Sequence, residues 1–267
     1  GTDSTGIVSL GMNSSQPVLA KECGPPEILM DSKKFEKVFY GTNKIYLGHN
    51  RSRTQGVVKR SNAHPFCFDR IFGAHNGTVH NGLSDLPDQC DTDSETILSA
   101  FNTLGVEKTI PKINGAWAFT WYDYTTDTIN FLRNKERPLY YAFSKDRRVI
   151  FWASMVEMLA LALNHNEIER ADNPRTNLVP ENLWLSFKIP KARSDEFAEP
   201  ARMTLEGKKL ENFRGSYSGS NTGAEDENPF GHWGGGEMGV AGYLPIRSQR
   251  HSTERKALVD KIINEGP

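Results

Sequence analysis

The chain has 267 residues, with 32 Lys and Arg against 33 Asp and Glu, and its formal net charge is −1. This balance argues against a basic nucleic-acid scaffold, and no apolar run approaches the roughly 18 residues of a membrane helix. The three cysteines, Cys23, Cys67 and Cys90, are too few for a disulfide framework and indicate reduced thiols. We therefore expect a soluble cytoplasmic protein with no nucleic-acid or membrane partner.

Composition divides the chain at about residue 190. Residues 1–190 have ordinary globular texture, whereas nine glycines fall within 28 positions from Gly215 to Gly242, a composition typical of an extended arm. A helical pattern returns over residues 252–264. We predict a globular domain over 1–190 and an extension over 191–267, made of a Gly-rich arm and a short terminal helix.

The first half of the domain alternates between strand and helix patterns. Residues 44–48 and 70–74 read as strands, and the second of these runs into His75-Asn76-Gly77. Thr92 and Glu95 form a capping box, and apolar residues follow at helical spacing, which predicts an amphipathic helix over 93–104.

The second half turns to an aromatic pattern of period two. It predicts one hairpin from residues 116–122 and 128–132, and another from 139–143 and 148–152. Ser154 is expected to cap a helix over 155–163, apolar on nearly every side and hence buried between layers. Runs of strands with few helices indicate an α+β fold with largely antiparallel sheets.

Three polar clusters are candidate sites. Arg51 follows a strand and suits a carboxylate, although an unpaired surface Arg is common. Asn76 and Gly77 form either a type I′ turn, which the sequence alone favours, or an oxyanion hole. Asp93 either stabilises a helix dipole or binds an ammonium group. Together they fit one pocket for a free α-amino acid whose side chain undergoes acyl transfer.

No metal or phosphate site is expected. Asp91, Asp93 and Glu95 lack the Gly and Glu that an EF-hand loop requires, and the cysteines lack zinc spacing. His64, His75 and His80 are scattered, and the simplest interpretation of each is a core or surface histidine. We expect neither a metal nor a cofactor.

The order of the motifs resembles the class II glutamine amidotransferases, and the resemblance spans residues 1 to about 187. The matching segments are Gly1-Thr-Asp-Ser-Thr-Gly-Ile7, His49-x-Arg51-x-x-Thr54-x-Gly56, Asn62-Ala63-His64-Pro65, His75-Asn76-Gly77 with Asn81, Thr92-Asp93-Ser94-Glu95, Gly115-Ala116-Trp117-Ala118, Arg133-Asn134 with Pro138-Leu139, and Ala153-Ser154.

The resemblance implies a four-layer αββα sandwich of the N-terminal-nucleophile hydrolase type, followed here by the Gly-rich extension. It implies that Arg51 binds the α-carboxylate of glutamine, that Asp93 binds its α-amino group and that Thr54 helps to line the pocket. Asn76 and Gly77 would form the oxyanion hole. In active relatives an N-terminal Cys attacks the side-chain amide, with its own α-amino group as general base.

The sequence has no counterpart of that nucleophile. In the family, the N-terminal Cys precedes the first motif, and this chain begins at that motif. Two functions stay open. One is an amidotransferase that hydrolyses glutamine to glutamate and ammonia with an upstream N-terminal Cys, and that serves an ammonia-acceptor protein. The other is a catalytically inactive homologue, such as a phage virion component in contact with virion neighbours and located in the virion.

Overall fold

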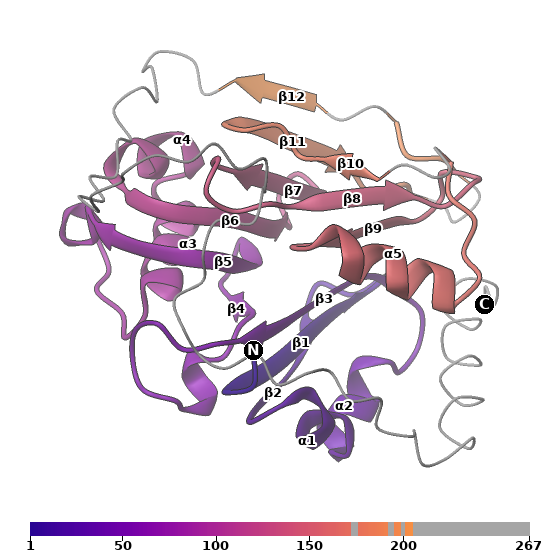
Figure 1. Cartoon of the computed structure of the whole chain (residues 1–267), viewed down its shortest axis with the longest axis horizontal. Coiled ribbons are helices and arrows are strands. Elements are labelled where there is room, and N and C mark those ends of the chain that lie inside the picture. Colours follow the sequence, from indigo (N-terminus) through magenta and orange to yellow (C-terminus); the bar gives the residue numbers. More distant parts are fainter. Residues whose placement is uncertain (172–175, 192–194, 199–200, 205–267) are drawn as a thin grey trace, which may run out of the picture.

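The computed structural model describes residues 1–171, 176–191, 195–198 and 201–204 (Figure 1). Its largest sheet has six strands in the order β12-β11-β7-β6-β5-β4, and each neighbouring pair is antiparallel. These strands are β4 (Phe66–Cys67), β5 (Ile71–Asn81), β6 (Asn114–Asp123), β7 (Thr128–Arg133), β11 (Leu183–Lys188) and β12 (Ala201–Thr204).

Two three-stranded antiparallel sheets lie opposite the large sheet (Figure 1). One has the order β2-β1-β3, and the other has the order β10-β8-β9. Their strands are β1 (Ser4–Gly11), β2 (Pro17–Cys23), β3 (Asn43–Arg51), β8 (Tyr140–Phe143), β9 (Ile150–Ala153) and β10 (Asn177–Leu178). One apolar cluster joins them to the large sheet, with Leu47 of β3, Phe143 of β8 and Phe131 of β7 among its members.

Helices pack on the outer sides of these sheets. The longest, α3 (Asp93–Thr103), packs with α4 (Val106–Thr109) against the large sheet through an apolar cluster that includes Ile97, Phe101 and Trp117. On the opposite side lie α1 (Pro26–Met30) and α2 (Lys33–Val38), which share a small core with β2, and α5 (Val156–His165), which packs on β8 and β9. Short 3₁₀ turns are η1 (Arg60–Asn62), η2 (Leu83–Asp85) and η3 (Ile110–Lys112).

The arrangement confirms a mixed α/β fold with antiparallel sheets and few helices. The two predicted hairpins are β6–β7 and β8–β9. The predicted helix at residues 93–104 is α3, and the Thr92 hydroxyl accepts the Glu95 backbone N–H at 3.2 Å, which is the N-cap half of the predicted capping box.

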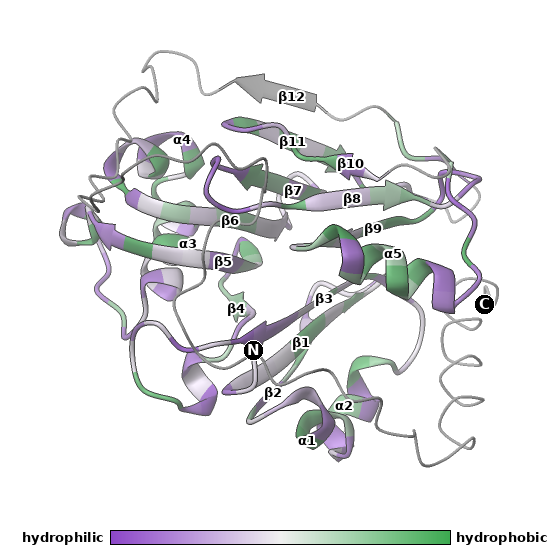
Figure 2. Cartoon of the chain, viewed as in Figure 1, coloured by the Kyte–Doolittle hydropathy of each residue, from purple (hydrophilic) through white to green (hydrophobic). Residues whose placement is uncertain are grey.

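The expectation for the helix after Ser154 was wrong in two respects. The N-cap is Met155, with no side-chain cap, and only Leu159 and Leu163 of α5 are buried. Met158 is 52% exposed and Leu161 is 71% exposed, and Figure 2 shows how hydrophobic this outer helix is. The helix covers a single sheet face, so its apolar residues exceed what that face can bury.

The Gly-rich arm at 215–242, the predicted helix at 252–264 and almost all of the proposed extension 191–267 lie outside the described residues. Among the described helices, none is long and apolar enough to cross a membrane.

Candidate functional site

Arg51 is the last residue of β3 and is 5% exposed. Its Nη2 donates to the backbone carbonyl of Gln55, while its Nη1 is buried and has no hydrogen-bond partner in the described part of the chain. Burial lowers the pKa of the guanidinium, and the nearby carboxylates of Asp93 and Asp3 oppose that shift. Arg51 is therefore a buried cation with an N–H group left to donate.

Asp93 is the first residue of α3 and is 4% exposed. Its Oδ2 accepts the backbone N–H of Val79 in β5 at 2.9 Å, and its Oδ1 lies 3.4 Å from the Ser94 hydroxyl. The Thr92 cap fixes the start of the helix, and the β5 contact fixes the carboxylate. The fold thus brings Asp93 into electrostatic contact with Arg51, which is far away in sequence.

Asn76 and Gly77 lie inside β5, opposite Ala118 and Trp117 of β6, so the type I′ turn interpretation was wrong. Gly77 has φ = 143°, and a Cβ at this position would overlap the Ala116 carbonyl. Only glycine fits this backbone. The strand pairing overrides the local Asn-Gly preference because both neighbours of this pair continue the β5–β6 ladder.

Thr54 lies exposed in the loop that follows β3. Among the described residues, its side chain forms no hydrogen bond with Arg51, Asp93 or Asn76, so its place in a pocket stays a prediction. Two residues that we did not single out hold this region in place. The Gln55 side chain donates to the Val79 carbonyl at 2.9 Å, and the Asp3 carboxylate accepts the Arg53 backbone N–H at 2.7 Å.

Three histidines lie near Arg51 or Asp93, of which His64 and His75 are buried and His49 is half-buried. The Nδ1 atoms of His49 and His64 are 3.1 Å apart, and Nδ1 of His75 is 2.9 Å from the Ser94 hydroxyl. Burial lowers the pKa of His75 to about 4 and that of His49 to about 3, and it lowers the pKa of His64 well below the ordinary value. All three are neutral at pH 7, so His64 and His75 are core histidines, whereas His80 is exposed.

The described residues contain neither a disulfide nor a candidate metal site. Cys23, Cys67 and Cys90 are free thiols, and burial raises the pKa of Cys67 to about 11, which suppresses its thiolate. No group of three or more His, Cys, Asp or Glu side chains is placed there to hold a metal ion.

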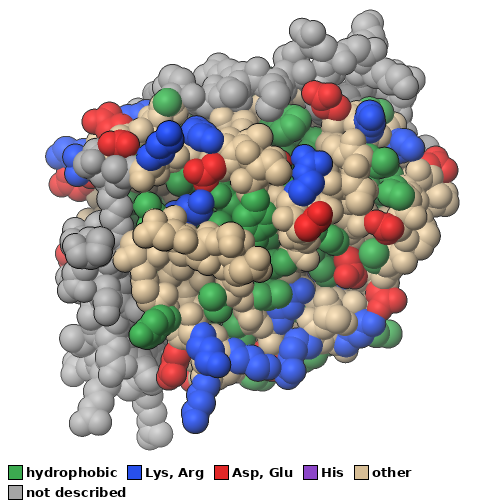
Figure 3. Space-filling model, turned by 180° about the vertical axis from the view of Figure 1, so that it is seen from behind, with side chains coloured by type: hydrophobic (Ala, Val, Ile, Leu, Met, Phe, Trp, Pro, Cys, Tyr) green, Lys and Arg blue, Asp and Glu red, His purple; other side chains and the backbone are tan. Residues whose placement is uncertain are grey.

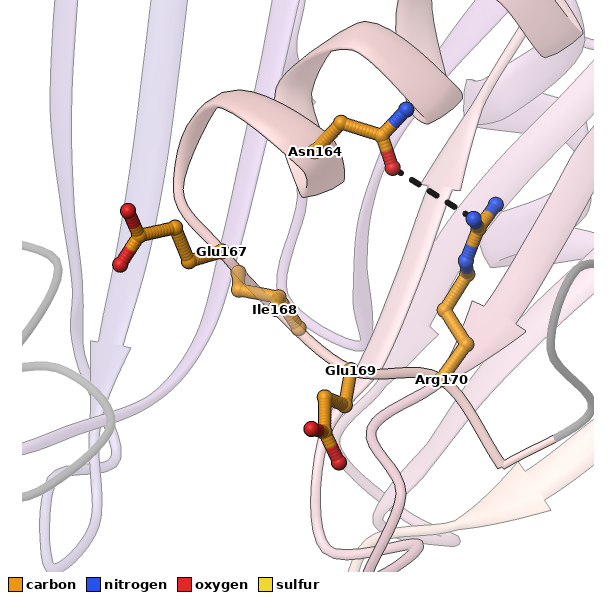
Figure 4. Close-up of a pocket in the computed structure, with 5 residues that line it drawn as sticks. All are labelled: Asn164, Glu167, Ile168, Glu169 and Arg170. Carbon is orange, nitrogen blue, oxygen red and sulfur yellow. Dashed lines mark hydrogen bonds between the residues drawn. The ribbon is translucent and has the colours of Figure 1, made fainter.

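A cavity of about 320 Å³ at the end of α5 contains none of these residues (Figure 4). It is lined by Asn164, Glu167, Ile168, Glu169 and Arg170. Arg170 donates to the Asn164 side chain at 3.4 Å, and Glu169 pairs with Lys145 at 2.6 Å. The candidate site is therefore the region of Arg51, Asp93 and the β5 strand, not this cavity.

Comparison with known families gives one family match. The family model for a glutamine amidotransferase domain matches residues 36–176, which is more than half of the chain. The chain therefore belongs to the glutamine amidotransferase domain family. No curated protein matches the sequence.

Two solved structures share the fold. The glutamine phosphoribosylpyrophosphate amidotransferase from B. subtilis, complexed with ADP and GMP, is 17% identical with a TM-score of 0.58. A structure described as the allosteric regulatory enzyme of purine biosynthesis is 18% identical with a TM-score of 0.59. Each comparison covers 77% of this chain and 43% of the other, so this chain spans less than half the length of these proteins.

Proposed function

We propose that this chain is the glutamine-hydrolysing domain of a class II amidotransferase with the N-terminal-nucleophile fold. The two facing layers of antiparallel strands, with helices on both outer sides (Figure 1), would correspond to a four-layer αββα sandwich. The proposal rests on the family membership and on the electrostatics around Arg51.

One observation carries the proposal, namely the buried N–H of Arg51 that no group in the described chain accepts. Leaving a charged donor unpaired in the interior is costly, about 1–3 kcal/mol or more. A ligand carboxylate would accept that N–H and neutralise the guanidinium. Asp93, held beside it, would accept the ammonium of the same ligand, which is the charge pattern of a free α-amino acid.

The oxyanion hole would come from the same strand, β5. The Asn76 side-chain amide forms no hydrogen bond within the described residues, and the neighbouring Gly77 has a positive φ of 143°. We propose that both donate to the oxygen that becomes negative when the glutamine amide is attacked. Thr54 would line the same pocket from the loop after β3.

The nucleophile would be an N-terminal Cys supplied ahead of Gly1. Gly1 packs against the peptide that joins Arg51 and Ser52, so a preceding segment would start beside the site. The thiolate would attack the amide carbon and release ammonia, and water would then hydrolyse the thioester to glutamate, so that glutamine and water give glutamate and ammonia. The ammonia acceptor would be a further domain or protein.

Calorimetry with glutamine tests the binding site directly. We expect Arg51→Ala to abolish glutamine binding, because the charge-assisted contact with the ligand carboxylate would be lost, and Asp93→Asn to weaken it at least tenfold. Arg53→Ala is the matched control, since Arg53 is exposed in the adjacent loop, and it should bind as the unchanged protein does.

Equal glutamine affinity in Arg51→Ala and Arg53→Ala would contradict the proposed site. An assembly protein without catalysis would release no ammonia and would co-purify with a large particle, so a glutaminase assay on the native protein separates the two functions left open by the sequence.

A further inference from the structure

A second cavity has a volume of about 540 Å³. Its walls come from β2, α2, η1, β4 and the first turn of α3, and its lining residues are Leu19, Lys21, Lys34, Arg60, Ser61, Phe66, Cys67 and Glu95. Asp93 and Glu95 are two residues apart on α3, roughly 200° around the helix axis. The first turn of α3 thus presents one carboxylate to the glutamine site and another to this cavity.

Three cationic side chains reach the cavity from three separate elements. Lys21 extends from β2, Lys34 from α2 and Arg60 from η1. Seen from behind, the molecule gathers Lys and Arg side chains along its lower edge (Figure 3), the edge at which Figure 1 places β2, α1 and α2. The lining of the cavity itself carries these three cations and a single carboxylate, that of Glu95.

Two of these cations lack a close ion pair within the described residues, although Lys34 interacts electrostatically with Glu22 and Lys21 with Glu95. Neither Lys21 nor Lys34 forms an ion pair there, whereas Arg60 pairs with Glu22 at 2.7 Å. The Lys21 ammonium makes one long hydrogen bond, 3.4 Å, to the Ser61 carbonyl. Burial lowers its pKa to about 8, and Cys67 and Glu95 oppose the shift only in part. An anion here would relieve the cost of burying this amine.

The cavity also has an apolar side. Phe66 is 3% exposed overall, and Leu19 is 40% exposed. The Lys21 Nζ lies 4.5 Å from the centre of the Phe66 ring, a cation–π distance. A ligand that combined an anionic group with a flat apolar group could contact both kinds of surface.

We propose that this cavity binds the phosphate group of a small phosphate monoester, with the apolar part of the ligand against Leu19 and Phe66. Cations that converge from three directions suit the several oxygens of a phosphate better than the two oxygens of a carboxylate, which a single planar guanidinium satisfies. The site is additional to the proposed glutamine site and shares none of its residues.

Phenyl phosphate is a suitable probe, with titration by calorimetry at saturating glutamine. We expect saturable binding that is at least tenfold weaker in Lys21→Met and severalfold weaker in Lys34→Ala. We expect Glu95→Gln to strengthen binding, because it removes the one negative charge of the lining. The control is Lys33→Ala, since Lys33 is also exposed on α2 but does not line the cavity.

The exposed position of Lys34 keeps the test independent of any folding defect in Lys21→Met. Arg51→Ala should bind phenyl phosphate normally, which separates this site from the proposed glutamine site. Benzoate and phenol should bind at least tenfold more weakly than phenyl phosphate. The proposal is overturned if Lys34→Ala and Lys21→Met bind as Lys33→Ala does, if binding is not saturable, or if benzoate binds as tightly as phenyl phosphate.

Discussion

At the scale of single residues, the site depends on polar groups that the core holds in unusual states. Arg51 is a buried cation with an unused donor, and Gly77 has a backbone that a side chain would prevent. Around them, His49, His64 and His75 stay uncharged because burial disfavours the imidazolium form. The Gly77 backbone and the uncharged histidines each lead to a testable prediction about stability.

Gly77→Ala should destabilise the protein by well over 1 kcal/mol, because the added Cβ combines a strained positive φ with overlap of the Ala116 carbonyl. Gly105→Ala is the matched control. Gly105 has φ = 88°, but nothing lies within 4 Å of an added Cβ. Gly105→Ala therefore introduces backbone strain without any steric overlap. Urea unfolding measures both variants, and equal losses would contradict the close approach of β5 and β6.

The buried histidines predict lower stability in acid. Their pKa values are lowered in the folded state, so between pH 6.5 and about 4 the unfolded chain binds protons that the folded chain does not. The unfolding free energy should fall with decreasing pH, by at most about 1.4 kcal/mol per pH unit for each histidine. In all three histidines, burial lowers the pKa because it disfavours the charged imidazolium.

His64→Gln should make this pH dependence less steep, because one of the three groups is removed. For each protein, we compare the change in unfolding free energy between pH 7 and pH 5. A loss of stability that the substitution causes equally at both pH values cancels in this difference. His165→Gln is the control, since His165 is exposed at the end of α5. An unchanged slope in His64→Gln would show that His64 is not held neutral by the fold.

At the scale of elements, α3 links the sequence to the site most directly. Thr92 caps the helix, and the next residue, Asp93, is the proposed ammonium ligand. Thr92→Ala should cost about 1 kcal/mol of stability and weaken glutamine binding severalfold, because the helix start that carries Asp93 loses its anchor. Thr92→Ser, which keeps the hydroxyl, should restore both in unfolding and calorimetry. Loss of binding in both variants would rule out the cap as the reason.

Elements with strong local patterns were predictable, and those defined by tertiary packing were not. The Thr92 N-cap of α3 and the period-two hairpins are determined by local sequence, and they form as predicted. The Asn76-Gly77 pair favoured a turn locally, but the β5–β6 ladder placed it within a strand. The exposed outer face of α5 was missed because an apolar helix pattern does not say how many neighbours will cover it.

In the candidate site, too, residues in local motifs were predictable and residues brought together by tertiary packing were not. Arg51 and Asp93 were identified from their motifs, and the fold brings their charges together. Gln55 and Asp3 escaped notice because their roles are hydrogen bonds to the backbone of the loop after β3 and of β5, which no side-chain pattern reveals. The contact between His49 and His64 joins β3 to the segment between η1 and β4, and sequence spacing does not predict it.

At the scale of the whole molecule, four apolar clusters hold the described domain together. The nine glycines from Gly215 to Gly242 have a composition typical of an extended arm and not of a packed core. Removing residues 215–267 should therefore leave the thermal midpoint of this domain within about 2 °C, less than the shift that 1 kcal/mol produces in a domain of this size. A fall of 10 °C or more would show that the extension is part of the core, contrary to the proposed division at residue 190.

The central claim is that this fold hydrolyses glutamine with an N-terminal Cys beside Arg51 and Asp93. The most direct measurement is the N-terminal sequence and intact mass of the protein from its native source, before and after treatment with a glutamine analogue that alkylates the nucleophile. We predict an N-terminal Cys ahead of Gly1 that gains one analogue, together with ammonia release from glutamine. A mature chain that begins at Gly1, unmodified by the analogue, would contradict the claim.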